Sequence, residues 1–334
     1  MASATTLSAP VPAHELHPEP NTSNDLPILQ SNEGAQVASG WMTPTPRDTP
    51  LSEMRERYER DGYIWVKNVI PRDVVLDMRE NYFTALLPTK ILAPSTSPRD
   101  GIFNPDNDPL SYQGIGGTPD DVISALLDEI HAAPYYREFL AHEDLRKFVR
   151  EFMGWEREVL VERAMLRHNV PGGRSTGVHY DKYFLRGSPT PFLTAWVPIG
   201  DCSPHGGGLM YLANSNSLGE SLEKQFLAKA AHLSQEERES AFNECMNADG
   251  FLSHNAGGFV REIGDGGNGE GWKWLVGDYA AGDVVFHKPY MVHAATRNVD
   301  ERGRIRLASD LRFYEDGKGL DERWRRVWRH DDGL

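Results

Sequence analysis

The stretch that decides the fold runs from residue 175 to residue 199 and reads STGVHYDKYFLRGSPTPFLTAWVPI. Its triplet His179-Tyr180-Asp181 is typical of a β-strand, in which residues two apart project to the same face. An imidazole nitrogen and a carboxylate oxygen on one face can chelate a divalent metal ion. One further histidine would complete the two-histidine, one-carboxylate set that leaves coordination positions open for oxygen chemistry at Fe(II).

Three other histidines precede an acid by two residues, and their surroundings separate them from this triplet. His142 and Asp144 fall in a segment from about 135 to 152 that is patterned as a helix, where residues two apart diverge. His17 lies in a Pro-rich N-terminal stretch, and His330 lies in the charged C-terminal tail. We therefore keep only the triplet at 179–181 as a metal pair.

Composition bounds the class of protein. The chain has 334 residues, 39% of them hydrophobic and 25% charged, which is typical of a soluble globular protein with a substantial core. Its net charge of −14 argues against nucleic acid or an anionic membrane as partner, since both need a basic surface. Two cysteines, Cys202 and Cys245, form no disulfide framework. With neither a signal peptide nor a membrane-length apolar run, we expect a cytoplasmic protein.

The pattern along the chain predicts one domain with a flexible extension. Residues 1–48 are rich in Pro, Ser and Thr and lack apolar periodicity, although part of them could lie over an active-site mouth. Residues 49–334 form the domain, with helices expected in 49–158 and short strands separated by Gly and Pro in 159–315. A helical, charged and Gly-rich insert occupies 218–278, and 316–334 is a tail. Strands at this spacing predict an antiparallel sandwich or barrel.

A second histidine ligand must come from a later strand. The segment GDVVFHKPYMVH, residues 282–293, offers His287 and His293, and spacing does not choose between them.

Several motifs together resemble the phytanoyl-CoA dioxygenase family of Fe(II)/2-oxoglutarate-dependent oxygenases. The resemblance covers most of residues 51–315. It is carried by Asp61-Gly-Tyr-Ile-Trp-Val-Lys67, His179-x-Asp181, Trp196, a Gly-Gly-Gly-Leu-Met-Tyr turn, Gly282-Asp283, and His293 with Asn298. It implies a mainly β fold with flanking helices around a double-stranded β-helix (jelly-roll or cupin-like) core. It also implies that His179, Asp181 and His293 are the metal ligands, and that His287 has no metal role.

The family also anchors the distal carboxylate of 2-oxoglutarate with a basic residue on the strand after the second histidine. A guanidinium suits this because it binds a carboxylate bidentately. Arg304 lies at the commonest distance from His293, and we lean slightly towards it. Arg306 fits better with the downstream pattern that ends at Arg312, so both stay open.

Other residues are weaker candidates for the pocket. Arg167 could reach a carboxylate, or it could form a surface ion pair. Aromatic residues on strands are more often core than ligand contacts. We assign Trp196 and Arg167 to cosubstrate binding, and Tyr180, Tyr183, Trp272 and Trp274 to substrate binding.

The resemblance implies a reaction with Fe(II), 2-oxoglutarate and O2. The expected activity is oxidation, by default hydroxylation, of an unactivated C–H bond of a small organic molecule in secondary metabolism, with release of succinate and CO2. The carboxylate of Asp181 argues against halogenation, because related halogenases have a small residue at that position. Two alternatives are a non-catalytic β-helix that binds a ligand, and a protein hydroxylase or demethylase of the same superfamily. A monomer and a homodimer both remain open.

Overall fold

A computed structural model describes residues 26, 28–34, 37, 39–117, 121–188, 191–240, 250–264 and 271–332. In these ranges the strands form a four-stranded sheet, ordered β1-β8-β7-β10, and a seven-stranded sheet, ordered β2-β3-β9-β6-β11-β4 with β5 also paired to β11. Side chains from both sheets meet in one apolar cluster that includes Trp65, Trp196 and Tyr211. The two sheets therefore face each other, which confirms the expected double-stranded β-helix.

The strands are short, apart from β11. Their bounds are β1 Ser39–Trp41, β2 Pro44–Thr45, β3 Tyr63–Val66, β4 Glu158–Leu160, β5 Met165–Asn169, β6 Leu193–Pro198, β7 Leu209–Leu212, β8 Trp274–Val276, β9 Val284–His287, β10 His293–Ala295 and β11 Arg306–Glu315. The helices are α1 Leu51–Asp61, α2 Arg72–Ala85, α3 Asp121–Ala132, α4 Pro134–Leu140, α5 Glu143–Met153, α6 Asn216–Lys229, α7 Gln235–Ser240 and α8 Ala256–Glu262. Single turns of 3-10 helix include η1 Leu87–Thr89, η2 Asp181–Tyr183 and η4 Glu322–Arg325.

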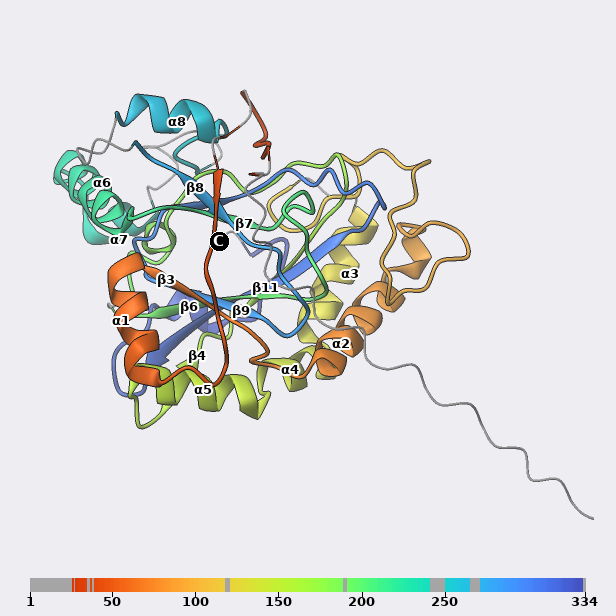
Figure 1. The fold of residues 1–334 in the computed structure, drawn as a ribbon, viewed down its shortest axis with the longest axis horizontal. Coiled ribbons are helices and arrows are strands. Elements are labelled where there is room, and N and C mark those ends of the chain that lie inside the picture. Colours follow the sequence, from red (N-terminus) through yellow and green to blue (C-terminus); the bar gives the residue numbers. More distant parts are fainter. Residues whose placement is uncertain are drawn as a thin grey trace, which may run out of the picture.

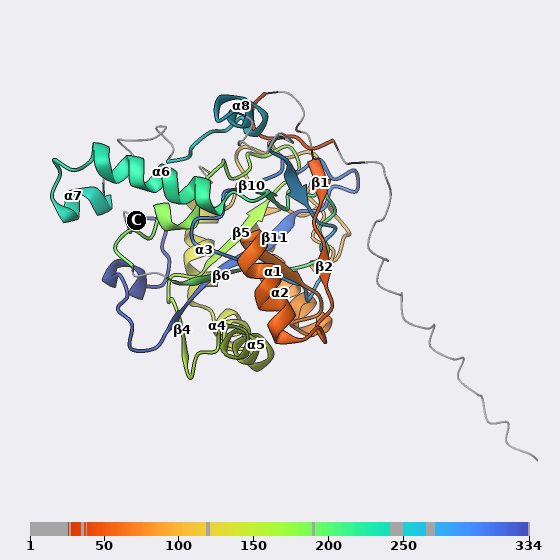
Figure 2. The same cartoon turned by 60° about the vertical axis from the view of Figure 1, so that its left-hand side comes forward.

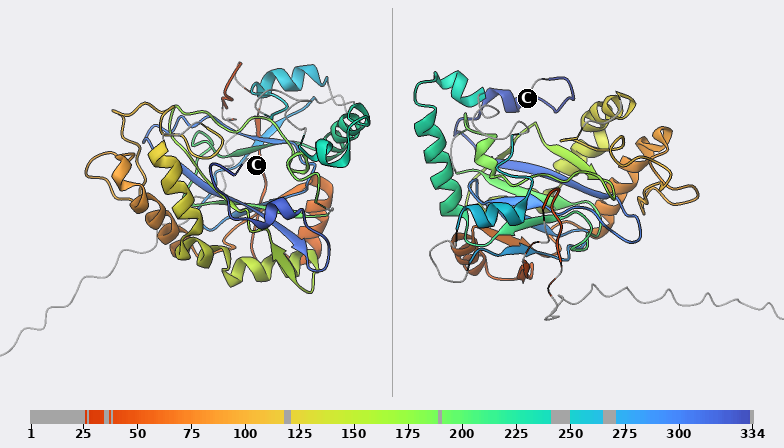
Figure 3. Two further views of the ribbon diagram at one scale, coloured as in Figure 1. Left: turned by 180° about the vertical axis from the view of Figure 1, so that it is seen from behind. Right: turned by 90° about the horizontal axis from the view of Figure 1, so that it is seen from above.

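Helices α2 to α5 lie along the outer face of the large sheet (Figures 1 and 3). The sequence of α5 shows why: Leu145, Phe148, Val149 and Phe152 recur at helical spacing and are all buried. Phe148 stacks on Phe286 of β9 with ring centroids 5.0 Å apart. This apolar face fixes the large sheet from outside and leaves its inner face for other chemistry.

The ordered domain begins upstream of the boundary expected at residue 49. Strand β1 pairs in parallel with β8, and β2 pairs in parallel with β3, so residues 39–45 belong to the two sheets. Edge strands are held by backbone hydrogen bonds, which an apolar pattern in the sequence does not report. Residues 1–25 of the expected extension lie outside the described residues.

The expected insert contains helices on two sides of the barrel. Helices α6 and α7 extend away from the sheets (Figure 2), and α8 lies next to β8 (Figure 1). Phe259 of α8 packs with Trp274 of β8 in an apolar cluster on the outside of the small sheet. Residues 241–249, with Cys245, and 265–270 lie outside the described part. Within the described ranges no helix is both long and apolar enough to cross a membrane.

Candidate metal centre

Two of the predicted ligands face each other across an isolated backbone bridge. The N–H of His179 donates to the carbonyl of His293 at 2.9 Å, and the N–H of His293 donates to the carbonyl of His179 at 2.8 Å. Asp181 does not continue the strand as the alternation predicted, because it begins the 3-10 turn η2. The turn still brings its carboxylate next to both imidazoles.

The three side chains converge with their ligand atoms. Asp181 Oδ1 lies 3.8 Å from His179 Nε2 and 3.9 Å from His293 Nε2. Each Nδ1 lies 2.9 Å from the backbone carbonyl two residues earlier, that of Gly177 or Met291. These carbonyls can only accept, so each Nδ1 carries the proton and each Nε2 lone pair is free for a metal.

The protonation states suit a divalent cation. Burial lowers the pKa of His179 to about 4 and also lowers the pKa of His293. Burial alone would raise the pKa of Asp181, but Arg312 and His287 outweigh it and hold that pKa well below its usual value. Neutral imidazoles beside an ionised carboxylate are the donors that metal binding requires. The arrangement therefore fits an iron ion.

A row of side chains from three adjacent strands holds the Asp181 carboxylate. Oδ2 accepts from Thr194 Oγ1 at 2.5 Å and lies 3.2 Å from His287 Nε2, and Oδ1 accepts from Arg312 Nη2 at 3.1 Å. Thr194 of β6 pairs directly with both His287 of β9 and Arg312 of β11. His287 Nδ1 in turn lies 3.1 Å from the hydroxyl of Tyr211.

Sequence reasoning missed this supporting row. It weighed His287 only as an alternative ligand and Arg312 only as part of a pattern, and it did not weigh Thr194. Their convergence depends on strand register, which no local motif specifies.

Arg312 has unmatched hydrogen-bonding capacity. It is only 5% exposed, and its Nε and Nη1 have no hydrogen-bond partner in the described part of the chain. Buried polar atoms are normally paired, so these donors are suited to an anionic or oxygen-bearing ligand close to the three candidate metal ligands.

The two candidate anchor arginines differ in their partners. Arg304 donates from Nε and Nη2 to Asp300 Oδ2, at 3.0 and 2.7 Å. Arg306 is 7% exposed and donates to the backbone carbonyls of Gly207, at 3.0 Å, and Arg167, at 3.3 Å. Among the described residues Arg306 has no carboxylate partner. Burial lowers the pKa of its guanidinium.

Arg167 lies beside Arg306 and belongs to the interior. It is on β5, pairs in register with Ala308 of β11, and donates to Asp310 Oδ2 at 2.9 Å. The ion pair weighed from the sequence therefore exists, but it lies inside the barrel, where the side chains of Arg167 and Asp310 are only 19% and 18% exposed.

Four of the aromatic residues suggested for ligand binding are at most 1% exposed, because the protein's own side chains cover them. Trp196 packs edge-on against Tyr279, and the Tyr180 hydroxyl donates to Glu223 of α6 at 2.7 Å. Tyr183 packs against Tyr180, and Trp274 donates to a backbone carbonyl of α8. Trp272 is partly buried and packs against the same outer cluster as Trp274.

Two other rings, which the sequence did not indicate, lie against a candidate ligand. The centroids of Phe184 and Phe251 are 5.5 and 5.7 Å from that of His179. Phe251 lies within the insert, between α7 and α8, so it reaches the site through tertiary structure that no local pattern reveals.

Comparison with known proteins places the chain among oxygenases of one fold. The family model described as phytanoyl-CoA dioxygenase matches residues 58–306. A search of curated proteins finds no match. One similar solved structure is the non-heme alpha-ketoglutarate-dependent carbocyclase SnoK from nogalamycin biosynthesis, at 17% identity over 81% of this chain and 87% of that one, with a TM-score of 0.50. Another is EctD from S. alaskensis with 2-oxoglutarate and 5-hydroxyectoine, at 16% identity over 91% and 88%, with a TM-score of 0.49.

Proposed function

Because the chain belongs to the phytanoyl-CoA dioxygenase family, it is an Fe(II)- and 2-oxoglutarate-dependent oxygenase, and we propose that it hydroxylates an unactivated C–H bond of a small organic molecule. The balanced reaction consumes 2-oxoglutarate, O2 and the substrate, and it yields succinate, CO2 and the alcohol. One oxygen atom enters succinate and the other enters the product. The convergence of His179, Asp181 and His293 carries this proposal.

In the proposed site these three residues hold the iron. Bound iron supplies the activation of O2 that couples loss of CO2 from 2-oxoglutarate to oxidation of the substrate. The chain's own contribution is to fix the ligands before the metal binds. Hydrogen bonds at Nδ1 set the tautomer of both histidines, and Thr194 and His287 orient the Asp181 carboxylate.

We propose Arg306, rather than Arg304, as the anchor of the distal 2-oxoglutarate carboxylate. A buried guanidinium without a counter-charge is costly, and a carboxylate of the cosubstrate would supply that charge. Arg304 already has its counter-charge in Asp300. The longer loop that this choice requires between His293 and the anchor agrees with β11 beginning at Arg306.

The substrate would be held beside the His179 ring. Phe184 and Phe251 provide an apolar wall there, and such a wall excludes water and favours a hydrocarbon portion of the substrate. The intact carboxylate of Asp181 occupies the position that a halide would need, which favours hydroxylation over halogenation.

An anaerobic titration tests the proposal. Fe(II) is added to the full chain, then 2-oxoglutarate, and the visible charge-transfer band of the chelate is followed; pools of small molecules are then screened for a change in that band. The expected result is a saturable band followed by substrate-dependent succinate formation in air. A band without succinate from any pool would favour the non-catalytic alternative, and turnover with a protein extract alone would favour a protein substrate.

A further inference from the structure

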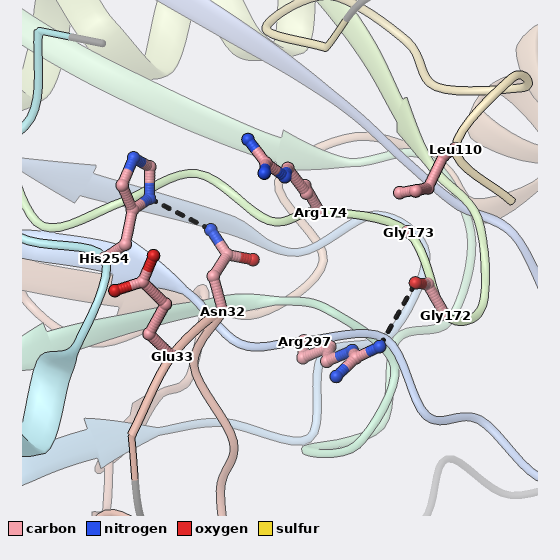
Figure 4. A pocket seen from close by; sticks show the side chains of 8 residues that line it. All are labelled: Asn32, Glu33, Leu110, Gly172, Gly173, Arg174, His254 and Arg297. Atoms are coloured by element: carbon pink, nitrogen blue, oxygen red, sulfur yellow. Dashed lines mark hydrogen bonds between the residues drawn. The ribbon is translucent and has the colours of Figure 1, made fainter. Parts of the chain in front are cut away.

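A cavity of about 260 Å³, here called the basic pocket, lies apart from the three proposed ligands. Figure 4 shows its walls, which come from five separate segments of the chain. They are formed by Asn32, Glu33, Leu110, Gly172, Gly173, Arg174, His254 and Arg297. None of these residues has a role in the chemistry proposed above.

The basic pocket carries two guanidinium groups without a carboxylate partner among the described residues. Arg174 has an exposed side chain, and Arg297 donates from Nη2 to the carbonyl of Gly172 at 3.3 Å. Glu33 is the acidic residue of the lining, and among the described residues it forms no ion pair with either arginine. Other arginines of this acidic chain, such as Arg57 and Arg72, are paired with carboxylates. Two uncompensated guanidiniums in one cavity suit a carboxylate or a phosphate group.

Hydrogen bonds fix the walls of the basic pocket. The amide of Asn32 donates to the carbonyl of Ser175 at 2.7 Å and accepts from the N–H of Ser175 at 2.7 Å. The same Nδ2 lies 3.1 Å from His254 Nδ1 (Figure 4). Asn32 thus joins the N-terminal segment to the chain just after Arg174 and to the part of the insert just before α8.

Two arginines of the basic pocket are close in sequence to the proposed ligands. Arg174 precedes His179 by five residues, and Arg297 follows His293 by four. Phe251 connects the two sites, because its ring centroid lies 5.3 Å from that of His254 and 5.7 Å from that of His179. One aromatic ring therefore separates the wall of the basic pocket from a proposed iron ligand.

We propose that the basic pocket binds the anionic end, a carboxylate or a phosphate, of the molecule that is oxidised. Arg174 and Arg297 hold that end while an apolar portion passes Phe251 towards His179. This inference rests on the proposed function, and it restricts the substrate to small molecules with an anionic group.

Matched compound pairs test the inference. Each carboxylic acid or phosphate monoester is titrated beside its neutral ester or alcohol into the anaerobic complex with Fe(II) and 2-oxoglutarate, and the change in the visible band gives Kd. The anionic member should bind more tightly. Arg174→Gln and Arg297→Gln should each weaken it by about tenfold, as expected for loss of one charged hydrogen bond. Glu33→Gln should tighten it, and the exposed Arg302→Gln should change it less than about twofold.

Calorimetric titration of inorganic phosphate into the metal-free chain separates this inference from the proposed function. Phosphate should bind the wild type and Arg302→Gln, and binding should be lost in Arg174→Gln/Arg297→Gln. Phosphate binding without the visible band of the Fe(II) and 2-oxoglutarate complex would contradict the proposed function but support the anion site. A normal band with equal affinity for neutral and anionic members, unaffected by the arginine variants, would overturn the inference. If no pair changes the band, absence of phosphate binding would overturn it as well.

Discussion

Both faces of β11 are largely buried, but they have different roles. On the outer face Leu307, Leu311 and Phe313 pack into the core under the helices. On the inner face Arg306 and Arg312 are only 7% and 5% exposed, against 0% for Leu311. Apolar side chains are stabilised by burial itself, whereas a buried charge needs a partner. Burial alone therefore does not distinguish residues of the core from residues of the candidate site. A buried charge whose partners are incomplete does distinguish them.

Removing the Asp181 carboxylate, which Arg312 of the inner face holds, should have the largest effect. In Asp181→Ala we expect no measurable band with Fe(II) and 2-oxoglutarate and no succinate, because one ligand is lost and Arg312 is left without its partner. Iron binding is measured by titration, and folding by circular dichroism.

Asp181→Asn provides a second variant of similar shape in case the alanine variant folds poorly. The exposed Asp201→Ala, which removes a surface pair with Arg72 and a hydrogen bond from the backbone N–H of Ala281, is the control and should keep full activity. Succinate release that persists in either Asp181 variant would contradict the assignment of the ligand.

A large-to-small substitution on the outer face should lower the stability of the protein without changing its affinity for Fe(II). Leu311→Ala leaves a cavity under the helices, and we expect the free energy of unfolding to fall by about 3 kcal/mol. Urea denaturation measures the loss, and Fe(II) affinity of the folded protein should be unchanged. A large change in that affinity would show that the two faces are not separable.

Low pH should lower the free energy of unfolding because of a buried histidine on the outer side of the large sheet. His168 lies 2.5 Å from the Tyr82 hydroxyl and 2.9 Å from the carbonyl of Tyr112, and burial lowers its pKa to about 4. In the unfolded chain His168 has a pKa near 6.5, so as the pH falls it is protonated there before it is protonated in the folded protein. Stability from this residue is therefore complete above about pH 6.5 and is lost progressively towards pH 4, by up to about 3 kcal/mol.

Denaturation at several pH values tests this expectation with His168→Asn and with the exposed His232→Gln as control. The slope between pH 6.5 and 4 should become shallower only in the His168 variant. Equal slopes in all three proteins would exclude His168 as the origin.

Separate alanine variants of the two candidate anchors should show which arginine binds 2-oxoglutarate. Arg306→Ala should raise the KM for 2-oxoglutarate by about 10- to 100-fold, which corresponds to loss of a charge-assisted hydrogen bond. Arg304→Ala removes a pair with Asp300 and should change that KM by less than about threefold. The opposite ranking would make Arg304 the anchor.

Within the inner face, a supporting residue should have the smallest effect. Thr194→Val keeps the shape of the side chain and removes the hydrogen bond to Asp181 Oδ2. We expect Fe(II) affinity to fall by about tenfold, the lower range for outer-shell partners of a metal ligand. Thr194→Ser should restore the affinity, and a failure of serine to do so would point to packing rather than hydrogen bonding.

The sequence contained enough to predict the fold and a candidate site. A histidine and an aspartate two residues apart, followed by a later histidine, indicated the proposed ligand set, and the family resemblance chose His293 over His287. The side chains do converge, although Asp181 lies in a turn and not in the strand.

What the sequence could not provide depends on register and on tertiary packing. The spacing between His293 and the next strand slightly favoured Arg304, whereas the partners of the two arginines are the reason for proposing Arg306. Tyr180 and Tyr183 are next to the ligands in sequence, yet α6 covers this stretch, with Glu223 bonded to Tyr180. Conversely, Phe251 is distant in sequence and packs on His179.

The reciprocal backbone bridge between His179 and His293 has a consequence for which metal ions the site accepts. Two backbone hydrogen bonds, and not the ion, fix the separation of the two imidazoles, so the proposed site is rigid before a metal ion binds. Ions of similar radius, such as Co(II) or Ni(II), should then enter without remodelling the sheets. Selection for iron would rest with cellular supply and with reactivity, while the protein offers the same geometric template to each competitor.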